Sequence, residues 1–141
     1  AASTGHLVFG TLHTQNASKT VDRVIDIFPV NQQAQIRSSL SDTLKAVVAQ
    51  SLCKRCDIKG RCAALEILIV TPAVSNLIRE SKTFQLPSVI QIGKKHGMVT
   101  LEDSIMTYLQ KRWITPEEAY DKAVDKQKFL PLLSKPPDDL S

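Results

Sequence analysis

Apolar side chains recur at helical spacing in the first third of the chain, and this pattern predicts two amphipathic helices. The first opens at Ser18 or Lys19, is stopped by Pro29, and carries its apolar face on Val21, Val24, Ile25 and Phe28. The second is capped by Asn31, ends near Gln50, and carries its apolar face on Ile36, Leu40, Leu44, Val47 and Val48. Each helix therefore has one face available for burial in a hydrophobic core.

Three further segments have the composition of β-strands. The first is the apolar run in Gly5-His6-Leu7-Val8-Phe9-Gly10, which ends in hydroxyl and imidazole side chains at Thr11, His13 and Thr14. Residues 51–56 and 61–70 predict a hairpin across a turn at 57–60, with a central strand over 63–70. Ligands of open α/β sheets bind at the carboxyl ends of strands, so His13 is a candidate for binding or catalysis. A structural, hydrogen-bonded histidine is the alternative.

After Val70 the pattern becomes wholly helical. The predicted helices cover 72–80 with Thr71 as cap, 87–95 with Gly97 as terminator, 100–112 opened by Thr100, and a last helix opened by Thr115 in a capping box. Beyond Val124 the sequence is rich in charge and proline, which is typical of mobile segments. We therefore expect an α/β portion over 1–70, an all-helical subdomain over 71–125 and a mobile tail over 126–141.

Composition indicates a globular protein with a modest core. The chain has 141 residues, of which 43% are apolar, and a formal net charge of +4. The longest apolar run, at 67–70 with its neighbours, is too short to span a bilayer. No signal-peptide pattern precedes it, so we expect a cytoplasmic location.

The basic residues gather in two places. Lys54, Arg55, Lys59 and Arg61 surround one turn, and the segment 94–96 forms a second group. Nucleic-acid modules usually add aromatic side chains for stacking or a basic recognition helix, and this sequence has neither signal, so we expect no nucleic-acid partner. A solvated basic turn is the favoured interpretation, and a neighbouring subunit, an acidic lipid surface or a nucleotide remain as alternatives.

The three cysteines lie close together as a C-x-x-C pair, Cys53 and Cys56, followed by Cys62. Structural zinc sites need four ligands, commonly as two close pairs, and no fourth ligand is near in sequence. We therefore favour reduced thiols in a β-hairpin over a zinc site, and predict no metal ligands.

Two motifs in one register give the chain a specific resemblance. The block GHLVFGTLHT at 5–14 looks like the His box of type IV pilus retraction ATPases of the PilT type, and AVSNLIRE at 73–80 looks like their AIRNLIRE motif. Residues 19–29 and 46–50 agree with the same family. The resemblance implies the C-terminal part of a RecA-like P-loop ATPase core, an α/β fold, followed by a helical subdomain.

The resemblance also implies roles for individual residues near bound ATP. His13 is the His-box residue expected to approach the γ-phosphate or sense its loss, and His6 is expected to support the loop. Thr11 and Thr14 are expected to hydrogen-bond the neighbouring acidic motif, and Gln50 to lie near the nucleotide.

We expect a structural role for an acidic and a basic side chain that follow the His box. Asp22 and Arg23 lie on the predicted first helix. They are expected to form a structural ion pair or an interface pair and not to take part in catalysis.

The glycines are scattered and do not form a phosphate-binding loop. Such a loop needs Gly-rich backbone followed by Lys and Ser or Thr, and none of the five glycines precedes that pair. In the family the Walker A loop, the acidic motif and the Walker B carboxylate all precede the His box. We therefore expect a C-terminal fragment whose full-length form binds ATP and Mg²⁺ as a homo-hexamer, while the fragment alone is inactive.

The motif AVSNLIRE predicts an amphipathic helix. Its residues are Ala73, Val74, Ser75, Asn76, Leu77, Ile78, Arg79 and Glu80. Positions 73, 74, 77 and 78 form the apolar face, and 76, 79 and 80 the polar one. The resemblance implies that this helix couples nucleotide state to subunit movement, although Ser75 replaces the arginine of the family motif.

The function implied is that of a motor for pilus retraction and twitching motility. The resemblance places it in the cytoplasm, peripherally at the inner-membrane face, where it acts on the pilus platform protein. A pilus-assembly or type II secretion ATPase, or a non-enzymatic basic interaction module, is the alternative.

Overall fold

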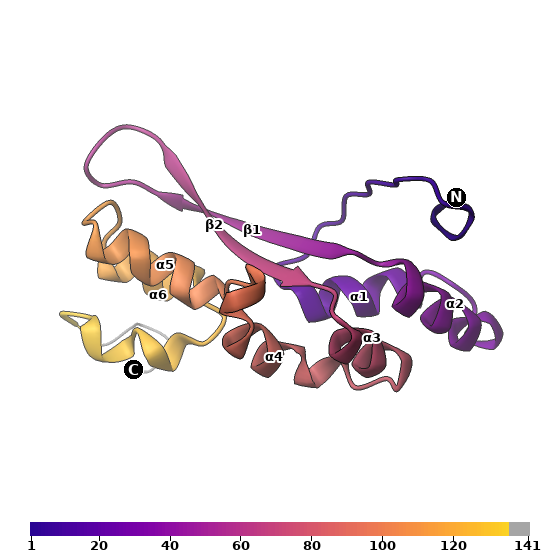
Figure 1. Cartoon of the computed structure of the whole chain (residues 1–141). Helices are drawn as coiled ribbons and strands as arrows, with labels where there is room; N and C mark the ends of the chain where they lie inside the picture. The colour runs from indigo at the N-terminus through magenta and orange to yellow at the C-terminus, as the bar shows by residue number, and fades with distance from the viewer. Residues whose placement is uncertain (136–141) are drawn as a thin grey trace. The chain divides into compact units, whose positions relative to one another are not determined.

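The computed structural model describes residues 1–135, which form helices and a two-stranded antiparallel sheet (Figure 1). The elements, in chain order, are α1 (Ala17–Asp26), α2 (Val30–Thr43), β1 (Ala46–Lys54), β2 (Arg61–Ile69), α3 (Pro72–Arg79), α4 (Leu86–Ile92), α5 (Leu101–Gln110) and α6 (Pro116–Lys122). Short 3₁₀ turns connect several of them. Within this part of the chain, no helix combines the length and the hydropathy that crossing a bilayer requires.

The strands β1 and β2 form a hairpin whose register is fixed at both ends. Val70 N–H donates to the carbonyl of Lys45 at 2.9 Å, and Arg55 N–H donates to the carbonyl of Gly60 at 3.0 Å. Burial alternates along both strands, as expected for a sheet with one covered face. The register therefore places Cys53 opposite Cys62 on the covered face.

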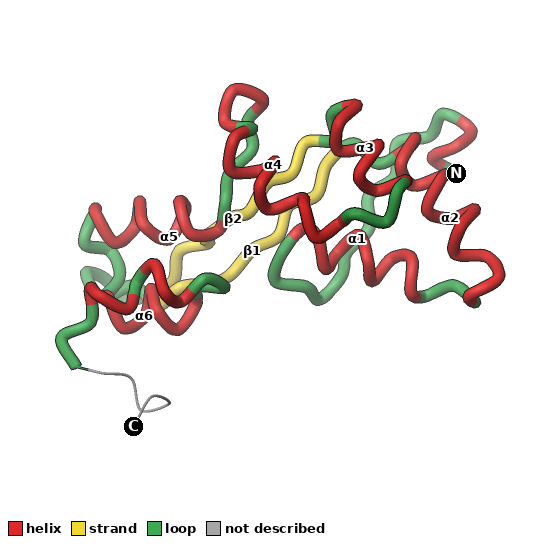
Figure 2. The backbone as a smooth tube through the Cα atoms, turned by 90° about the horizontal axis from the view of Figure 1, so that it is seen from below, coloured by secondary structure: helices red, strands yellow, loops and turns green. Residues whose placement is uncertain are grey.

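The residues fall into two compact units, each with its own hydrophobic core. The first unit consists of Ala1–Ala49 and Glu66–Val99. Helices α1, α3 and α4 cover one face of the strands there, with α2 packed beside α1 and α3 (Figure 2). Its fully buried side chains include Ile25, Leu68 and Ile78.

The second unit consists of Gln50–Leu65 and the chain from Thr100 onward. Its core is built from Cys53, Cys62 and Ala64 of the hairpin together with α5 and α6. Phe129, which follows α6, is fully buried in the same cluster. The Tyr108 hydroxyl donates to the carbonyl of Ala63 at 2.7 Å and ties α5 to β2.

Threonine caps open three of the helices, as the sequence predicts. The hydroxyls of Thr71, Thr100 and Thr115 accept hydrogen bonds from the main-chain N–H groups of Val74, Asp103 and Glu118. Each cap satisfies a donor that has no partner within its helix. Helix α1 is capped instead by Asn16, which lies two residues before the predicted start at Ser18.

Three predicted elements are wrong in type or extent. The second helix ends at Thr43, and Val47 and Val48 lie in β1, where the β-branched pair sits in a pleated strand. The helix predicted over 87–95 ends at Ile92, and a 3₁₀ turn over Lys94–His96 precedes Gly97. A Cβ at Gly93 would lie 2.5 Å from the Met98 sulfur, so the turn at this position packs closely against buried Met98.

The third wrong element is the first predicted strand. Residues 6–14 are extended but form no strand, and Leu7 and Phe9 are 79% and 88% exposed. A strand requires a neighbouring strand for its main-chain hydrogen bonds, and no strand within residues 1–135 pairs with this segment.

The two units also divide the chain differently from the expected boundary at residue 70. The hairpin contributes residues to both cores, because each strand is nine residues long and different helices cover its two halves. The mobile tail expected over 126–141 falls partly on 136–141, which lie outside the described residues. Within 126–135 the chain forms two short 3₁₀ turns around buried Phe129.

Candidate functional site

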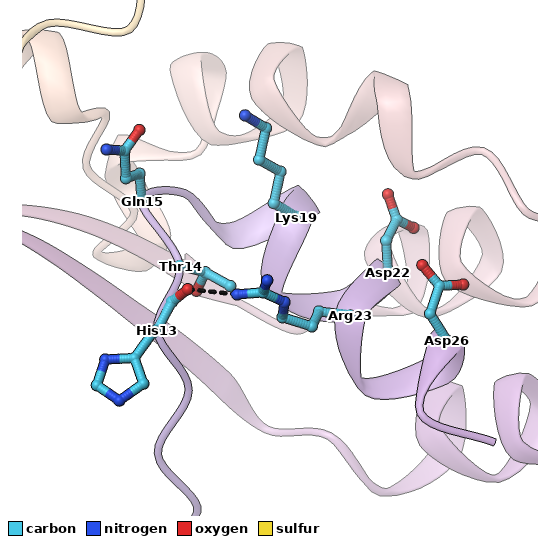
Figure 3. Close-up of a pocket in the computed structure, with 7 residues that line it drawn as sticks. All are labelled: His13, Thr14, Gln15, Lys19, Asp22, Arg23 and Asp26. Atoms are coloured by element: carbon cyan, nitrogen blue, oxygen red, sulfur yellow. Dashed lines mark hydrogen bonds between the residues drawn. The ribbon is translucent and has the colours of Figure 1, made fainter.

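The end of the His-box block is attached to α1 by hydrogen bonds. Arg23 Nη1 donates to the carbonyl oxygen of His13 at 2.6 Å (Figure 3). The hydroxyl groups of Thr14 and Thr20 form a hydrogen bond, and Thr20 also donates to the carbonyl of Asn16 at 2.8 Å. These bonds hold the carbonyl of His13 and the side chain of Thr14 against the first turns of the helix.

A pocket of about 500 Å³ lies beside this junction. Its lining residues are His13, Thr14, Gln15, Lys19, Asp22, Arg23 and Asp26. The charged side chains are balanced in sign, because α1 supplies two cations and two carboxylates. Such a surface suits a ligand that has both polar and charged groups.

The side chains of the pocket do not all point into one space. Figure 3 shows the imidazole of His13 directed away from Asp22 and Asp26, while Arg23 reaches across to the carbonyl of His13. Asp22 accepts a hydrogen bond from the Thr83 hydroxyl at 2.8 Å. Arg23 and Asp22 therefore bind different partners, the His13 carbonyl and the Thr83 hydroxyl, and each bond stabilises the first unit.

Only part of the predicted site is brought together. His13 and Thr14 line the pocket, whereas Thr11 is exposed and is not among the residues that line it. The Nδ1 atom of His6 lies 3.0 Å from the hydroxyl of Thr4, a local contact within the first residues. Gln50 is an exposed residue of β1 and belongs to the second unit.

Two residues that the sequence analysis does not single out hold the start of α1 beside the pocket. Glu66 is buried in β2, and its carboxylate accepts a hydrogen bond from the N–H of Ala17 at 2.8 Å, at the start of α1. Asn16 caps the same helix through the N–H of Lys19. An asparagine directly before an apolar helical pattern is a recognisable cap signal, but nothing in the sequence links Glu66 to α1.

The AVSNLIRE segment forms α3 and packs on α2. Val74 and Ile78 are fully buried, and Leu77 is partly buried against the same core, whereas Ala73 is exposed and does not join the apolar face. The Ser75 hydroxyl donates to the carbonyl of Ser41 at 2.6 Å. The family's arginine position is thus occupied here by a short side chain that bonds the neighbouring helix.

The polar face of α3 is organised around Arg79. Its guanidinium contacts the carboxylate of Asp42 at 2.6 Å and the side-chain oxygen of Asn76 at 3.0 Å. Glu80 pairs with Lys82 at 3.0 Å. The side chains of these ion pairs are about half exposed, so a partner can reach this face. The ion pair with Asp42 of α2 keeps Arg79 in place.

The cysteines are free thiols at the end of the hairpin, and Cys53 and Cys62 are buried. Burial, with a further contribution from nearby Cys62, raises the pKa of Cys53 to about 11, and burial also raises the pKa of Cys62. Both thiols are therefore protonated at neutral pH, as expected for buried cysteines that are not activated as nucleophiles. Among residues 1–135, no group of His, Cys, Asp and Glu has an arrangement suited to a metal ion.

Comparison with known proteins identifies relatives along most of the chain. The chain is 50% identical over 129 residues to the twitching motility protein of Neisseria gonorrhoeae, an alignment that covers 92% of this chain and 34% of that protein. It is also 50% identical over 129 residues to the type IV pilus retraction ATPase PilT of Pseudomonas aeruginosa, covering 92% of this chain and 37% of PilT. The chain spans about a third of the length of these relatives.

The fold agrees with these alignments. The structure is similar to the crystal structure of the pilus retraction motor PilT with bound ADP, with a TM-score of 0.80 and 40% identity over 91% of this chain and 35% of that one. The mixed helix-and-strand class predicted from the sequence is therefore confirmed, as part of a larger ATPase fold. The family described as Type II/IV secretion system protein matches residues 1–120. The chain belongs to this family of secretion and pilus ATPases.

Proposed function

We propose that the full-length protein containing this chain is a hexameric, Mg²⁺- and ATP-dependent motor that drives type IV pilus retraction and twitching motility. The observation that carries the proposal is the 50% identity to a twitching motility protein and to PilT along 92% of the chain. The motor would act in the cytoplasm, at the inner-membrane face of the pilus machine, on the platform protein.

In this proposal His13 acts on the γ-phosphate of ATP. The bond from Arg23 to the His13 carbonyl supports this role, because it anchors the main chain and leaves the imidazole free to turn toward a ligand. His6 supports the loop, and Thr11, Thr14 and Gln50 contribute polar contacts around the nucleotide. ADP is bound in the structure of the PilT relative, and a phosphate-binding loop has to come from elsewhere in the protein.

The helix α3 would couple nucleotide state to movement. Its apolar face holds it in the core of the first unit, and the half-exposed pair of Arg79 and Asp42 gives it a defined polar surface. A surface of this kind transmits displacement without taking part in chemistry. Ser75 alters the motif at one position and keeps α3 bonded to α2.

The test is the steady-state ATPase rate of the full-length protein with His13→Ala. We expect a loss of about 10²-fold or more, the scale of removing a positioned polar group at a charged transition state. His96→Ala, an exposed histidine in a 3₁₀ turn of the same unit, is the matched control and should keep its rate. An unchanged rate for His13→Ala would assign His13 a structural role. The 141-residue chain alone should not hydrolyse ATP.

A further inference from the structure

The end of the hairpin gathers cations from two segments of the second unit. Lys54, Arg55, Lys59 and Arg61 come from the hairpin, and Lys111 and Arg112 follow α5. We call these six side chains the basic tip. The hairpin turn lies beyond the strands at one end of the ribbon (Figure 1).

Several contacts hold the two segments of the basic tip together. The N–H of Cys56 donates to the carbonyl of Trp113 at 2.8 Å, and the Cys56 thiol donates to the carbonyl of Arg112 at 3.5 Å. The guanidinium of Arg55 lies 4.1 Å from the centre of the Trp113 ring, and the ammonium of Lys111 lies 4.7 Å from it. The cations are therefore positioned by the fold and do not form a loose charged loop.

The placement of these like charges lowers the stability of the folded hairpin. The hairpin register places Lys54 directly opposite Arg61 on the exposed side of the strands, and like charges in that position destabilise a sheet. The nearby carboxylates are already engaged, since Asp57 pairs with Arg55 and Glu118 accepts the main-chain N–H of Lys54 at 2.7 Å. Like charges that the fold holds opposite each other, with no free carboxylate between them among residues 1–135, indicate a surface kept for binding an anionic partner.

The side chain at the apex of the turn is apolar. Ile58 is 58% exposed and lies between Asp57 and Lys59. An exposed aliphatic residue in a turn flanked by the cations of the basic tip suits the boundary between lipid headgroups and acyl chains. Single-stranded nucleic acid would instead need free aromatic faces, and Trp113 already stacks on Tyr108 and carries Arg55 and Lys111.

We propose that the basic tip binds the surface of a membrane that contains anionic phospholipid. The cations attract the negatively charged headgroups, and Ile58 enters the headgroup region. The basic tip shares no residue with the nucleotide site or with the coupling helix, and its binding does not depend on ATP. It rests on the inner-membrane location in the proposed function and adds the surface that contacts the lipid.

The experiment is sedimentation of the full-length protein with two kinds of vesicle, phosphatidylcholine alone and phosphatidylcholine with phosphatidylglycerol in equal parts. We expect binding to the anionic vesicles only, weakening as salt is raised. Lys54→Gln/Arg61→Gln should reduce this binding by roughly fivefold for each cation removed. The same variant should melt at the same or a higher temperature, because the repulsion across the strands is lost. Lys45→Gln/Lys95→Gln, which removes equal charge from exposed positions of the first unit, should bind nearly as well as the unmodified protein.

Three results would overturn the proposal: equal binding to neutral vesicles, equal losses in the two double variants, or tighter binding of a single-stranded oligonucleotide than of anionic vesicles. An ATPase assay on the same samples keeps the two proposals apart. Loss of vesicle binding with an unchanged ATPase rate supports the membrane surface, and an inactive unmodified protein that still binds vesicles contradicts only the motor.

Discussion

The two motifs that identify this family behave in opposite ways within the same unit. Residues 6–14 are extended and exposed, with Phe9 at 88% exposure and no partner strand within the part of the chain that the structure describes. Helix α3 is capped by Thr71, buried through Val74 and Ile78, and paired to α2 through Arg79 and Asp42. A helix satisfies its main-chain hydrogen bonds from its own sequence, whereas a strand depends on a distant segment.

The largest expected effect concerns the buried side of α3. Ile78→Ala removes a fully buried side chain from the core of the first unit and should lower the free energy of unfolding by about 2–5 kcal/mol. Leu7→Ala, at a 79% exposed aliphatic position of the extended segment, is the matched control and should be nearly neutral. Urea unfolding of the 141-residue chain measures both. Equal losses of unfolding free energy in the two variants would mean that residues 6–14 are packed as firmly as α3.

The polar side of α3 sharpens the contrast between packing and function. Arg79 and Asp42 are 45% and 63% exposed, so Arg79→Ala should change the free energy of unfolding by only about 0–1 kcal/mol. In the full-length protein we expect impaired twitching motility while ATP turnover is largely retained. Lys82→Ala is the control, because it removes the ion pair with Glu80, whose side chains are about as exposed as those of Arg79 and Asp42. Normal motility with Arg79→Ala would reduce α3 to a packing element.

The smallest expected effect lies in the extended segment. Phe9→Ser should leave the free energy of unfolding of the 141-residue chain within about 0.5 kcal/mol of its original value, because the ring contributes little buried area. Phe129→Ser, at a fully buried position, is the control of identical chemistry and should be strongly destabilising. Thermal melting distinguishes them. A large loss from Phe9→Ser would mean that the segment packs in solution.

The elements that the sequence predicts well are those with local signals. Thr71, Thr100 and Thr115 are recognisable as caps because the hydroxyl and the N–H that it bonds lie three residues apart. The spacing of Val47 from Leu44 fits a helical face and predicts a helix, but the pairing partners of Val47 in β2 are about twenty residues away in the sequence. Short apolar runs are ambiguous for this reason.

The candidate site was predictable only in part. The resemblance identified His13 and Thr14, and both line the pocket beside α1. The contact of Glu66 with Ala17 joins residues that are 49 positions apart, and no periodicity or motif reveals such a pair. The charge repulsion between Lys54 and Arg61 likewise became visible only once the hairpin register was known.

The close packing of Gly93 against Met98 has a chemical consequence. The Met98 thioether is 1% exposed, and a single added carbon at Gly93 would lie 2.5 Å from its sulfur. Peroxide converts methionine to its sulfoxide, which adds a polar oxygen to the sulfur. Because Met98 is buried, peroxide reaches its sulfur only when this part of the first unit opens. The rate of sulfoxide formation at Met98 therefore reports how often the core of the first unit is exposed to solvent.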